Sequence, residues 1–191
     1  MKKVLILGCP GAGKSTFARK LRDKTGLPLY YLDMIWHKPD RTTITKQEFD
    51  AKLSDIIKQE EWIIDGNYGR TLEMRFKECD TVFFLDLPTN VCLAGAEGRI
   101  GSEREDMPWQ EEELSAEFRN FIINFSRDEI PEINEMLRKY KNKNIEIMTH
   151  PGNCDLELYE KSSYSLNRVV ELSILCHQDI KDYRCMEMRK R

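Results

Sequence analysis

The stretch KKVLILGCPGAGKST, residues 2–16, decides the fold of this chain. It joins an apolar run of strand length to a glycine-rich turn and then to the start of a helical pattern. The run lacks the alternation of a half-buried strand, which indicates a strand covered on both faces, as in a parallel sheet. Residues 8–15 match G-x-x-x-x-G-K-[S/T], the Walker A pattern, in full and in the strand-to-helix context that it requires.

This motif predicts a cradle for the phosphates of a nucleotide, whereas the alternative is a glycine-rich turn with a solvated lysine. Glycines let the backbone curl until successive N–H groups point at phosphate oxygens, and the helix that follows adds the positive end of its dipole. Lys14 is expected to bridge the β- and γ-phosphates and the Ser15 hydroxyl to ligate Mg²⁺, so the predicted cofactors are ATP and Mg²⁺. The predicted nucleotide-binding residues are Gly8, Pro10, Gly11, Ala12, Gly13, Lys14, Ser15 and Thr16.

Strand-like and helical patterns alternate along the rest of the chain. Further strands are expected at 27–33, 61–66, 80–88 and 143–148. A first helix should run from Lys14 to a stop at Gly26, and a capping box at Thr45–Glu48 opens a second. Helical patterns also occupy 91–104, 114–125 and 133–140, and the first of these carries three glycines that should make it easily bent. This alternation predicts an α/β fold around a parallel sheet.

Composition limits the protein's partners. The 191 residues carry a net charge of -3, and the densest charge cluster, EREDMPWQEEE at 103–113, is mainly acidic. Both features argue against a face for nucleic-acid phosphates. No apolar run approaches the roughly 18 residues of a membrane span, and the N-terminal apolar stretch is too short for a signal-peptide core. The expected location is the cytoplasm. The six cysteines show no metal or disulfide spacing, so we expect reduced thiols, several of them buried.

A triphosphate cradle serves switches, motors and kinases alike, and other features favour a small kinase. The nearest match to the guanine motif N-K-x-D, at 142–145, lacks the aspartate, and no additional motor signature is present. A kinase needs an acceptor pocket, and polar side chains follow two predicted strands at the edge of the sheet where ligands bind. Asp33 is expected to orient an acceptor hydroxyl or act as a base, or else to cap a turn. The predicted substrate-binding residues are Asp33, Trp36, Asp65, Asn67, Tyr68 and Arg70, the last as a bidentate partner for an anionic group.

A kinase also needs a lid that excludes water and neutralises the transferring phosphoryl group. Arg99 and Arg104 lie in the glycine-containing segment that leads into the acidic stretch. They are predicted catalytic residues together with Lys14 and Asp33, and the alternative is a solvated pair bridging to Glu103 and Glu105.

The motifs of residues 1–148 resemble the P-loop kinases of the adenylate and shikimate kinase superfamily, and more closely the FlaR-type group described as DNA topology modulation proteins. The resemblance is carried by GCPGAGKSTFARKL, LYYLDMIWHKP, WIIDGNYGRTLEMRF, DTVFFLDLPTNVCLAGAEGRI and EREDMPWQEEE. It implies a three-layer P-loop NTPase fold with a five-stranded parallel sheet in the order 2-3-1-4-5, a short lid, MgATP as donor and an acceptor site near Asp33 and Arg70. The acceptor is left open among nucleotides, nucleosides and small hydroxyl metabolites. An ATP-binding regulatory protein without such an acceptor is the alternative.

Residues 149–191 form a C-terminal extension of a different character. The sequence from 145 to 183 is similar to the C-terminal portion of YdjC-type carbohydrate deacetylases, including an H-P-G turn at His150. The metal-binding motif of that family has no counterpart upstream in this chain, so we expect a structural role for His150. An amphipathic pattern at 166–174 is expected to pack on the core or to serve a homodimer.

Overall fold

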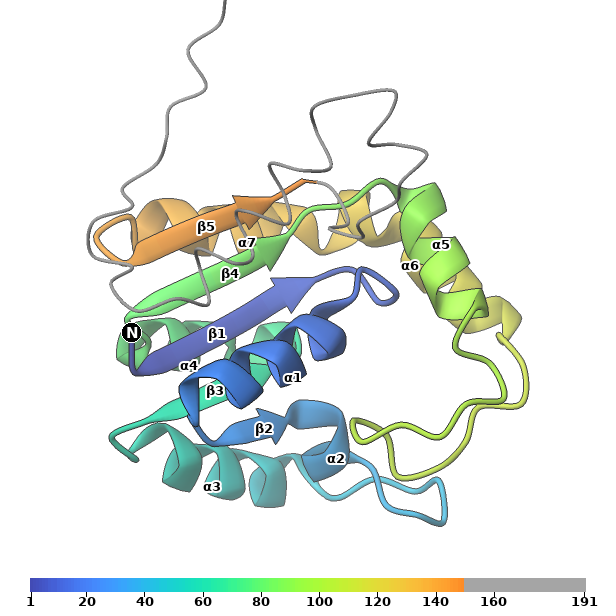
Figure 1. Cartoon of the computed structure of the whole chain (residues 1–191), viewed down its shortest axis with the longest axis horizontal. Coiled ribbons are helices and arrows are strands. Elements are labelled where there is room, and N and C mark those ends of the chain that lie inside the picture. Colours follow the sequence, from blue (N-terminus) through green and yellow to red (C-terminus); the bar gives the residue numbers. More distant parts are fainter. Residues whose placement is uncertain (150–191) are drawn as a thin grey trace, which may run out of the picture. The chain divides into compact units, whose positions relative to one another are not determined.

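The computed structural model describes residues 1–149 and contains a parallel sheet at its centre (Figure 1). The strands of these residues lie in the order β2-β3-β1-β4-β5, and each neighbouring pair is parallel. They are β1 (Lys3–Gly8), β2 (Leu29–Tyr31), β3 (Trp62–Asp65), β4 (Thr81–Leu85) and β5 (Asn144–Met148). The predicted α/β class and strand order are confirmed. The extension predicted at 149–191, with His150, lies outside the described residues except for Thr149.

Helices cover both faces of the sheet and make the fold three-layered. Figure 1 shows α1 in front of the sheet and α4 and α7 behind it. Residues 4–7 of β1 and 82–84 of β4 are at most 1% exposed, as expected for strands covered on both sides. None of the helices in the described part of the chain is long and apolar enough to cross a membrane. The helices are α1 (Lys14–Thr25), α2 (Leu32–Trp36), α3 (Lys46–Ile57), α4 (Leu72–Glu78), α5 (Thr89–Glu97), α6 (Ala116–Asp128) and α7 (Ile130–Lys139), with a 3₁₀ turn η1 at Gly69–Thr71.

Helix ends follow the local signals of the sequence. Helix α1 ends at Gly26, whose φ of 73° places it in the left-handed region and whose N–H donates to the carbonyl of Arg22 at 2.8 Å. Helix α3 begins with the predicted capping box, in which the Thr45 hydroxyl accepts from the Glu48 N–H and the Glu48 carboxylate accepts from the Thr45 N–H. Both predicted boundaries are confirmed.

Two predicted elements were too long, and α2 and α4 were not predicted. The strand expected at 27–33 ends at Tyr31, because the chain turns there into the short helix α2 with Asp33 in its first turn, where a carboxylate favours the helix N-terminus. The helix expected at 91–104 ends at Glu97. Residues 98–115 then run without helix or strand, and Gly101, with φ of 75°, together with Pro108, explains why the helix does not continue.

The glycine of α5 has a packing role that the sequence did not indicate. A Cβ on Gly95 would lie 2.2 Å from the carbonyl oxygen of Gly11, and a Cβ on Gly11 would lie 1.9 Å from the carbonyl oxygen of Cys92. The backbone of α5 therefore touches the backbone of the glycine-rich loop. We predicted that Gly95 makes this helix easy to bend, but the structure shows close approach of two backbones instead.

Gly95→Ala should therefore destabilise the protein, although alanine normally favours a helix. We expect a loss of about 1–3 kcal/mol in the free energy of unfolding, because the new methyl group must displace the loop backbone. Urea unfolding measures this loss. Gly98→Ala is the matched control, since its Cβ would approach only the Ala94 carbonyl, at 3.2 Å. Equal stability of the two variants would contradict the packing role.

Candidate functional site

The glycine-rich loop between β1 and α1 has the curled backbone that the motif predicts. Gly8, Gly11 and Gly13 adopt φ values of 144°, 81° and 88°, which favour glycine. The Ala12 N–H donates to the Cys9 carbonyl at 3.1 Å, and the Lys14 ammonium donates to the same carbonyl at 3.0 Å. Lys14 thus folds back over its own loop, where a bound phosphate would compete with this carbonyl for the ammonium.

Two buried carboxylates lie near Ser15, the second residue of α1. Asp65, the last residue of β3, and Asp106, from the 98–115 segment, are both close enough to Ser15 for its hydroxyl to lower the pKa of each carboxyl. Asp65 is 5% exposed and its Oδ1 has no hydrogen-bond partner. Burial raises the pKa of Asp65 to about 6, against the opposing effects of Lys14 and Ser15. The buried Oδ1 of Asp65 is therefore free to accept a hydrogen bond or to bind a cation near Ser15.

Asp106 was not among the predicted site residues. Burial raises the pKa of its carboxyl, but hydrogen bonds from Arg104 and Ser15 and the charge of Arg104 outweigh burial and hold the pKa below its usual value. The signal for this residue was the acidic stretch at 103–113, which we interpreted as evidence against a nucleic-acid face without assigning a role to its carboxylates. The structure places one of these carboxylates inside the site.

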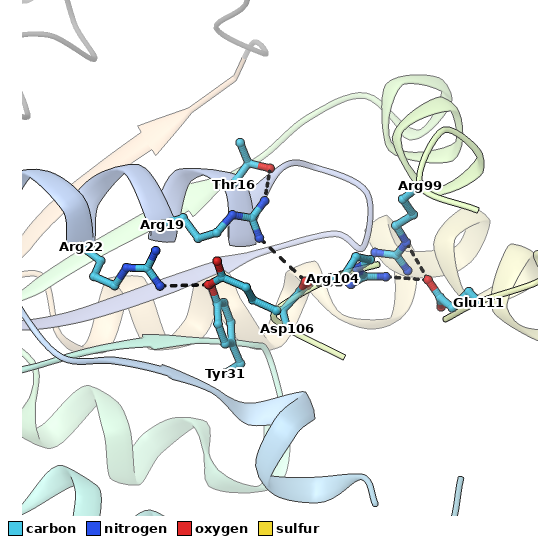
Figure 2. Close-up of polar contacts among 9 residues, drawn as sticks. Thr16, Arg19, Arg22, Tyr31, Arg99, Arg104, Asp106 and Glu111 are labelled. Atoms are coloured by element: carbon cyan, nitrogen blue, oxygen red, sulfur yellow. Dashed lines mark hydrogen bonds and ion pairs between the residues drawn. The ribbon is translucent and has the colours of Figure 1, made fainter. Parts of the chain in front are cut away.

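The two arginines predicted as lid residues converge on acidic partners (Figure 2). Arg104 donates to both carboxylate oxygens of Asp106, at 2.6 and 3.1 Å, and to Glu111 at 2.5 Å. Arg99 Nε lies 3.1 Å from the same Glu111 as an ion pair, without the alignment of a hydrogen bond. Both guanidinium groups are also close enough to Asp33 to interact with it electrostatically. The alternative to a catalytic role was a solvated pair bridging to Glu103 and Glu105; the structure instead pairs these arginines with Asp106 and Glu111.

Arginines of α1 hold the same segment from the other side. Arg19 Nη1 lies 3.9 Å from Asp106, and its Nη2 donates to the Thr16 hydroxyl at 3.2 Å. Arg22 donates to Glu105 at 2.9 Å (Figure 2). The 98–115 segment is thus attached to the helix that follows the phosphate loop by charge pairs, which a bound anion would rearrange.

On the acceptor side, Asp33 is oriented by a tyrosine. The Tyr68 hydroxyl donates to Asp33 Oδ1 at 2.8 Å, and burial together with this carboxylate raises the pKa of Tyr68 far above its ordinary value. Tyr68 stacks on Phe49 with ring centroids 5.0 Å apart, and Trp36 packs edge-on against Phe49 at 5.5 Å. Trp109 of the 98–115 segment contacts His37 in the same way at 5.0 Å. Asp33 is therefore held by a tyrosine that itself belongs to an aromatic cluster.

The remaining two predicted substrate residues have different environments. Asn67 uses its whole amide on the phosphate loop: its Oδ1 accepts from the Gly8 N–H at 3.1 Å, and its Nδ2 donates to the Gly8 carbonyl at 2.8 Å. Arg70 donates both terminal nitrogens to Asp50 of α3 at 2.7 Å, and this pair is nearly half exposed. The structure thus gives Asn67 a supporting role in the loop and engages Arg70 with a partner on the surface.

The oxygen atoms near Ser15 fit Mg²⁺ as the cation of a bound nucleotide. Within residues 1–149, no group of three or more His, Cys, Asp or Glu side chains forms a metal site by itself. Mg²⁺ is usually held by one or two carboxylates, water and the phosphates of the nucleotide, so a complete protein cage is not required. The free Oδ1 of Asp65 and the Ser15 hydroxyl supply protein ligands of the correct type.

Comparisons with known proteins agree with this architecture. No protein-family model matches the chain. The adenylate kinase of Thermotoga neapolitana is 31% identical over 88 residues, which are 45% of this chain and 39% of that protein. The chain thus spans about two fifths of the length of the curated relatives it first matches. A separate similarity, 43% identity over 49 residues, links 26% of the chain to 21% of a carbohydrate deacetylase of Oceanobacillus iheyensis, the kind of protein that the C-terminal extension resembles.

Among solved structures, a shikimate kinase from Bacteroides thetaiotaomicron superimposes with a TM-score of 0.53 at 17% identity, covering 90% of this chain and 97% of the other. At this identity the similarity establishes the fold. The five-stranded order and the loop after β1 are those of a P-loop kinase fold.

The buried carboxyl of Asp65 should weaken the apoprotein at neutral pH. Its pKa is higher in the folded chain, about 6, than the ordinary value of 3.8, so it favours the folded state fully below about pH 4 and loses that contribution as the pH rises through 6. In magnesium-free buffer, Asp65→Asn should raise the free energy of unfolding by about 1–3 kcal/mol at pH 7.5 and have little effect at pH 4.

Urea unfolding of the wild type and Asp65→Asn across this range measures the effect. The exposed Asp55, which pairs with Lys58, provides the control variant Asp55→Asn. A constant difference between wild type and Asp65→Asn at all pH values would contradict the raised pKa.

Proposed function

We propose that this chain is a kinase that transfers the γ-phosphoryl group of MgATP to an oxygen atom of a small acceptor. The observation that carries the proposal is a curled phosphate loop with Lys14 at the start of α1, together with two buried carboxylates, Asp65 and Asp106, the second of which is paired with Arg104. The acceptor is a nucleotide, a nucleoside or a small hydroxyl metabolite. In the reaction, the bond from the γ-phosphorus to the bridging oxygen breaks as a bond to the acceptor oxygen forms.

The phosphate loop and its neighbours bind the phosphates of the nucleotide and neutralise their charge. The loop amides and Lys14 hold the phosphate oxygens once the ammonium exchanges the Cys9 carbonyl for phosphate. The Ser15 hydroxyl and the buried carboxylates of Asp65 and Asp106 would hold Mg²⁺. The cation supplies charge neutralisation on the phosphates.

The arginines must change partners during the cycle. In the structure the guanidinium of Arg104 is saturated by Asp106 and Glu111, and Arg99 is paired with Glu111. Transferring phosphoryl oxygens offer a comparable bidentate acceptor, so these guanidinium groups can exchange carboxylate for phosphate with little change in position. They thereby stabilise the charge that develops on the phosphoryl group.

On the acceptor side, Asp33 orients the acceptor hydroxyl and removes its proton. Tyr68 fixes one oxygen of Asp33, which leaves the second oxygen to accept a hydrogen bond from the acceptor hydroxyl. The proton of that hydroxyl passes to Asp33 as the new phosphate ester forms. Tyr68 is held in this position by its packing against Trp36 and Phe49.

Within the P-loop kinases we assign the chain to the FlaR-type group, named for modulation of DNA topology. Support comes from the order of the segments around Lys14, Asp33 and Asp65 and from their amino-acid sequences. The acidic net charge of -3 gives no support to a direct effect on DNA, so we attribute any such effect to the phosphorylated product or to a partner.

Lys14→Ala should abolish the activity because it removes the ammonium that holds the phosphates. ADP release measured with a panel of nucleosides, nucleotides and small hydroxyl metabolites should identify an acceptor for the wild type. The variant should lose roughly a hundredfold or more in rate. Lys20→Ala, on the exposed face of the same helix, is the control and should retain activity. The proposal fails if no acceptor stimulates ADP release above basal hydrolysis.

Arg70 should distinguish anionic from neutral acceptors. Its pair with Asp50 is solvent-exposed and readily exchanged, so an anionic group on the acceptor can take the place of that carboxylate. Arg70→Met should therefore raise the KM for an anionic acceptor about tenfold or more and leave the KM for a neutral one unchanged. Steady-state kinetics with matched phosphorylated and unphosphorylated acceptors measure this. Equal effects on both acceptors would show that Arg70 only supports the fold.

A further inference from the structure

Arg75 is a buried cation whose hydrogen-bond acceptors are main-chain carbonyls. It lies on α4 with no exposed surface. Its Nε donates to the Thr71 carbonyl at 3.3 Å and its Nη1 to the Gly66 carbonyl at 2.7 Å. Its Nη2 donates to the carbonyls of Asn67 and Tyr68, the latter at 2.9 Å. One side chain therefore gathers three consecutive carbonyls of the loop after β3.

A cation in this position needs an explanation, because burial makes it costly. Burial lowers the pKa of Arg75 to about 9. A methionine or leucine would fill the same volume without the cost of desolvating a charge. Arg75 can do what an apolar side chain cannot: it donates hydrogen bonds to main-chain carbonyls and so fixes their direction.

The loop that Arg75 holds has an unusual backbone. Gly66 has a φ of 135° and its Cβ position is blocked by Leu32, and Tyr68 has a φ of 42°, which is rare for a residue with a side chain. Such conformations persist only where the surroundings enforce them. Five donors on one planar group can satisfy several carbonyls at fixed angles, whereas a lysine ammonium is a point charge without that geometry.

Each side of the candidate site is connected to this loop by one residue. Asn67 binds the backbone of Gly8 through both atoms of its amide, at the start of the phosphate loop. Tyr68 donates to Asp33 on the acceptor side. The carbonyls of both residues are acceptors of the same Arg75 nitrogen, so the position of that guanidinium sets the backbone from which the two contacts are made.

We propose that Arg75 is a positioning residue that sets the phosphate loop, through Asn67, and the Asp33 carboxylate, through Tyr68, in register with each other. The part of this inference that concerns Asp33 rests on the proposed kinase function. The part that concerns the phosphate loop requires only that the chain binds a nucleotide. Arg75 touches neither substrate. It acts by fixing the loop on which both contacts are built, and it accounts for a residue that the proposed mechanism does not otherwise use.

The test compares variants that break one connection with variants that break both. Asn67→Ala removes only the contact with Gly8 and should weaken binding of an ATP analogue about tenfold with little change in kcat. Tyr68→Phe removes only the contact with Asp33 and should lower kcat about tenfold with little change in nucleotide affinity. Arg75→Gln and Arg75→Lys should show both losses. Arg127→Gln, at an exposed pair with Asp128, is the control and should show neither.

Affinity is measured by calorimetry with MgATP analogue alone, on protein whose folded fraction is known from thermal unfolding. This readout separates positioning from stability: a purely structural arginine would lower the unfolding midpoint and leave the affinity of the folded molecules unchanged. The double variant Arg75→Gln/Asn67→Ala should bind the nucleotide no more weakly than Arg75→Gln, because both changes remove one connection.

Native affinity and native kcat in folded Arg75→Gln would overturn the proposal, as would additive losses in the double variant. Failure of both Arg75 variants to fold would also overturn it, because the arginine would then support the whole fold rather than this loop. Absence of MgATP binding by the wild type would instead refute the proposed function. The two failures are therefore distinguishable.

Discussion

Burial of opposite charges at the carboxyl ends of β1 and β3 is the constraint on which the site depends. Asp65 and Asp106 are about 95% buried, and both lie near Ser15 and Lys14. Isolated carboxylates in such surroundings are costly: Arg104 offsets this cost at Asp106, whereas at Asp65 the cost of burial outweighs the effect of Lys14. A site of this kind gains when a polyanion and a divalent cation enter together, since the charges then exchange partners without any group becoming unpaired.

The sequence predicts well where the signal is local. The glycine-rich loop, the stop at Gly26 and the capping box at Thr45 each depend on residues within one or two turns, and the alternation of apolar runs is enough for the class of sheet. The resemblance to P-loop kinases supplied the strand order, which local pattern does not contain. The exact ends of elements depend on tertiary contacts as well: residues 32 and 33, expected at the end of a strand over 27–33, belong to α2.

What the sequence did not predict were contacts between residues far apart in the chain. Gly95 was expected to make its helix easy to bend, because its spatial neighbour Gly11 lies 84 positions earlier in the chain. Asp106 was seen only as part of an acidic run, and Arg75 and its helix were not predicted, because nothing nearby in sequence marks these two side chains as buried. In each case the residue type is explained by a contact that the fold creates: Gly95 with the Gly11 backbone, Asp106 with Arg104, and Arg75 with main-chain carbonyls.

The same charge pairs also determine how the 98–115 segment can respond to a ligand. Two of its ion pairs, Arg19 with Asp106 and Arg22 with Glu105, join it to α1, whereas the pairs of Arg99 and Arg104 with Glu111 and Asp106 lie within the segment. Competing anions weaken such ion pairs much more readily than they weaken apolar packing. Its aromatic contact, Trp109 on His37, lies on the acceptor side. The segment is therefore attached by ion pairs on the side of α1 and by an aromatic contact at His37, so an anion that competes for Arg19 and Arg22 acts on the first attachment and leaves the second in place.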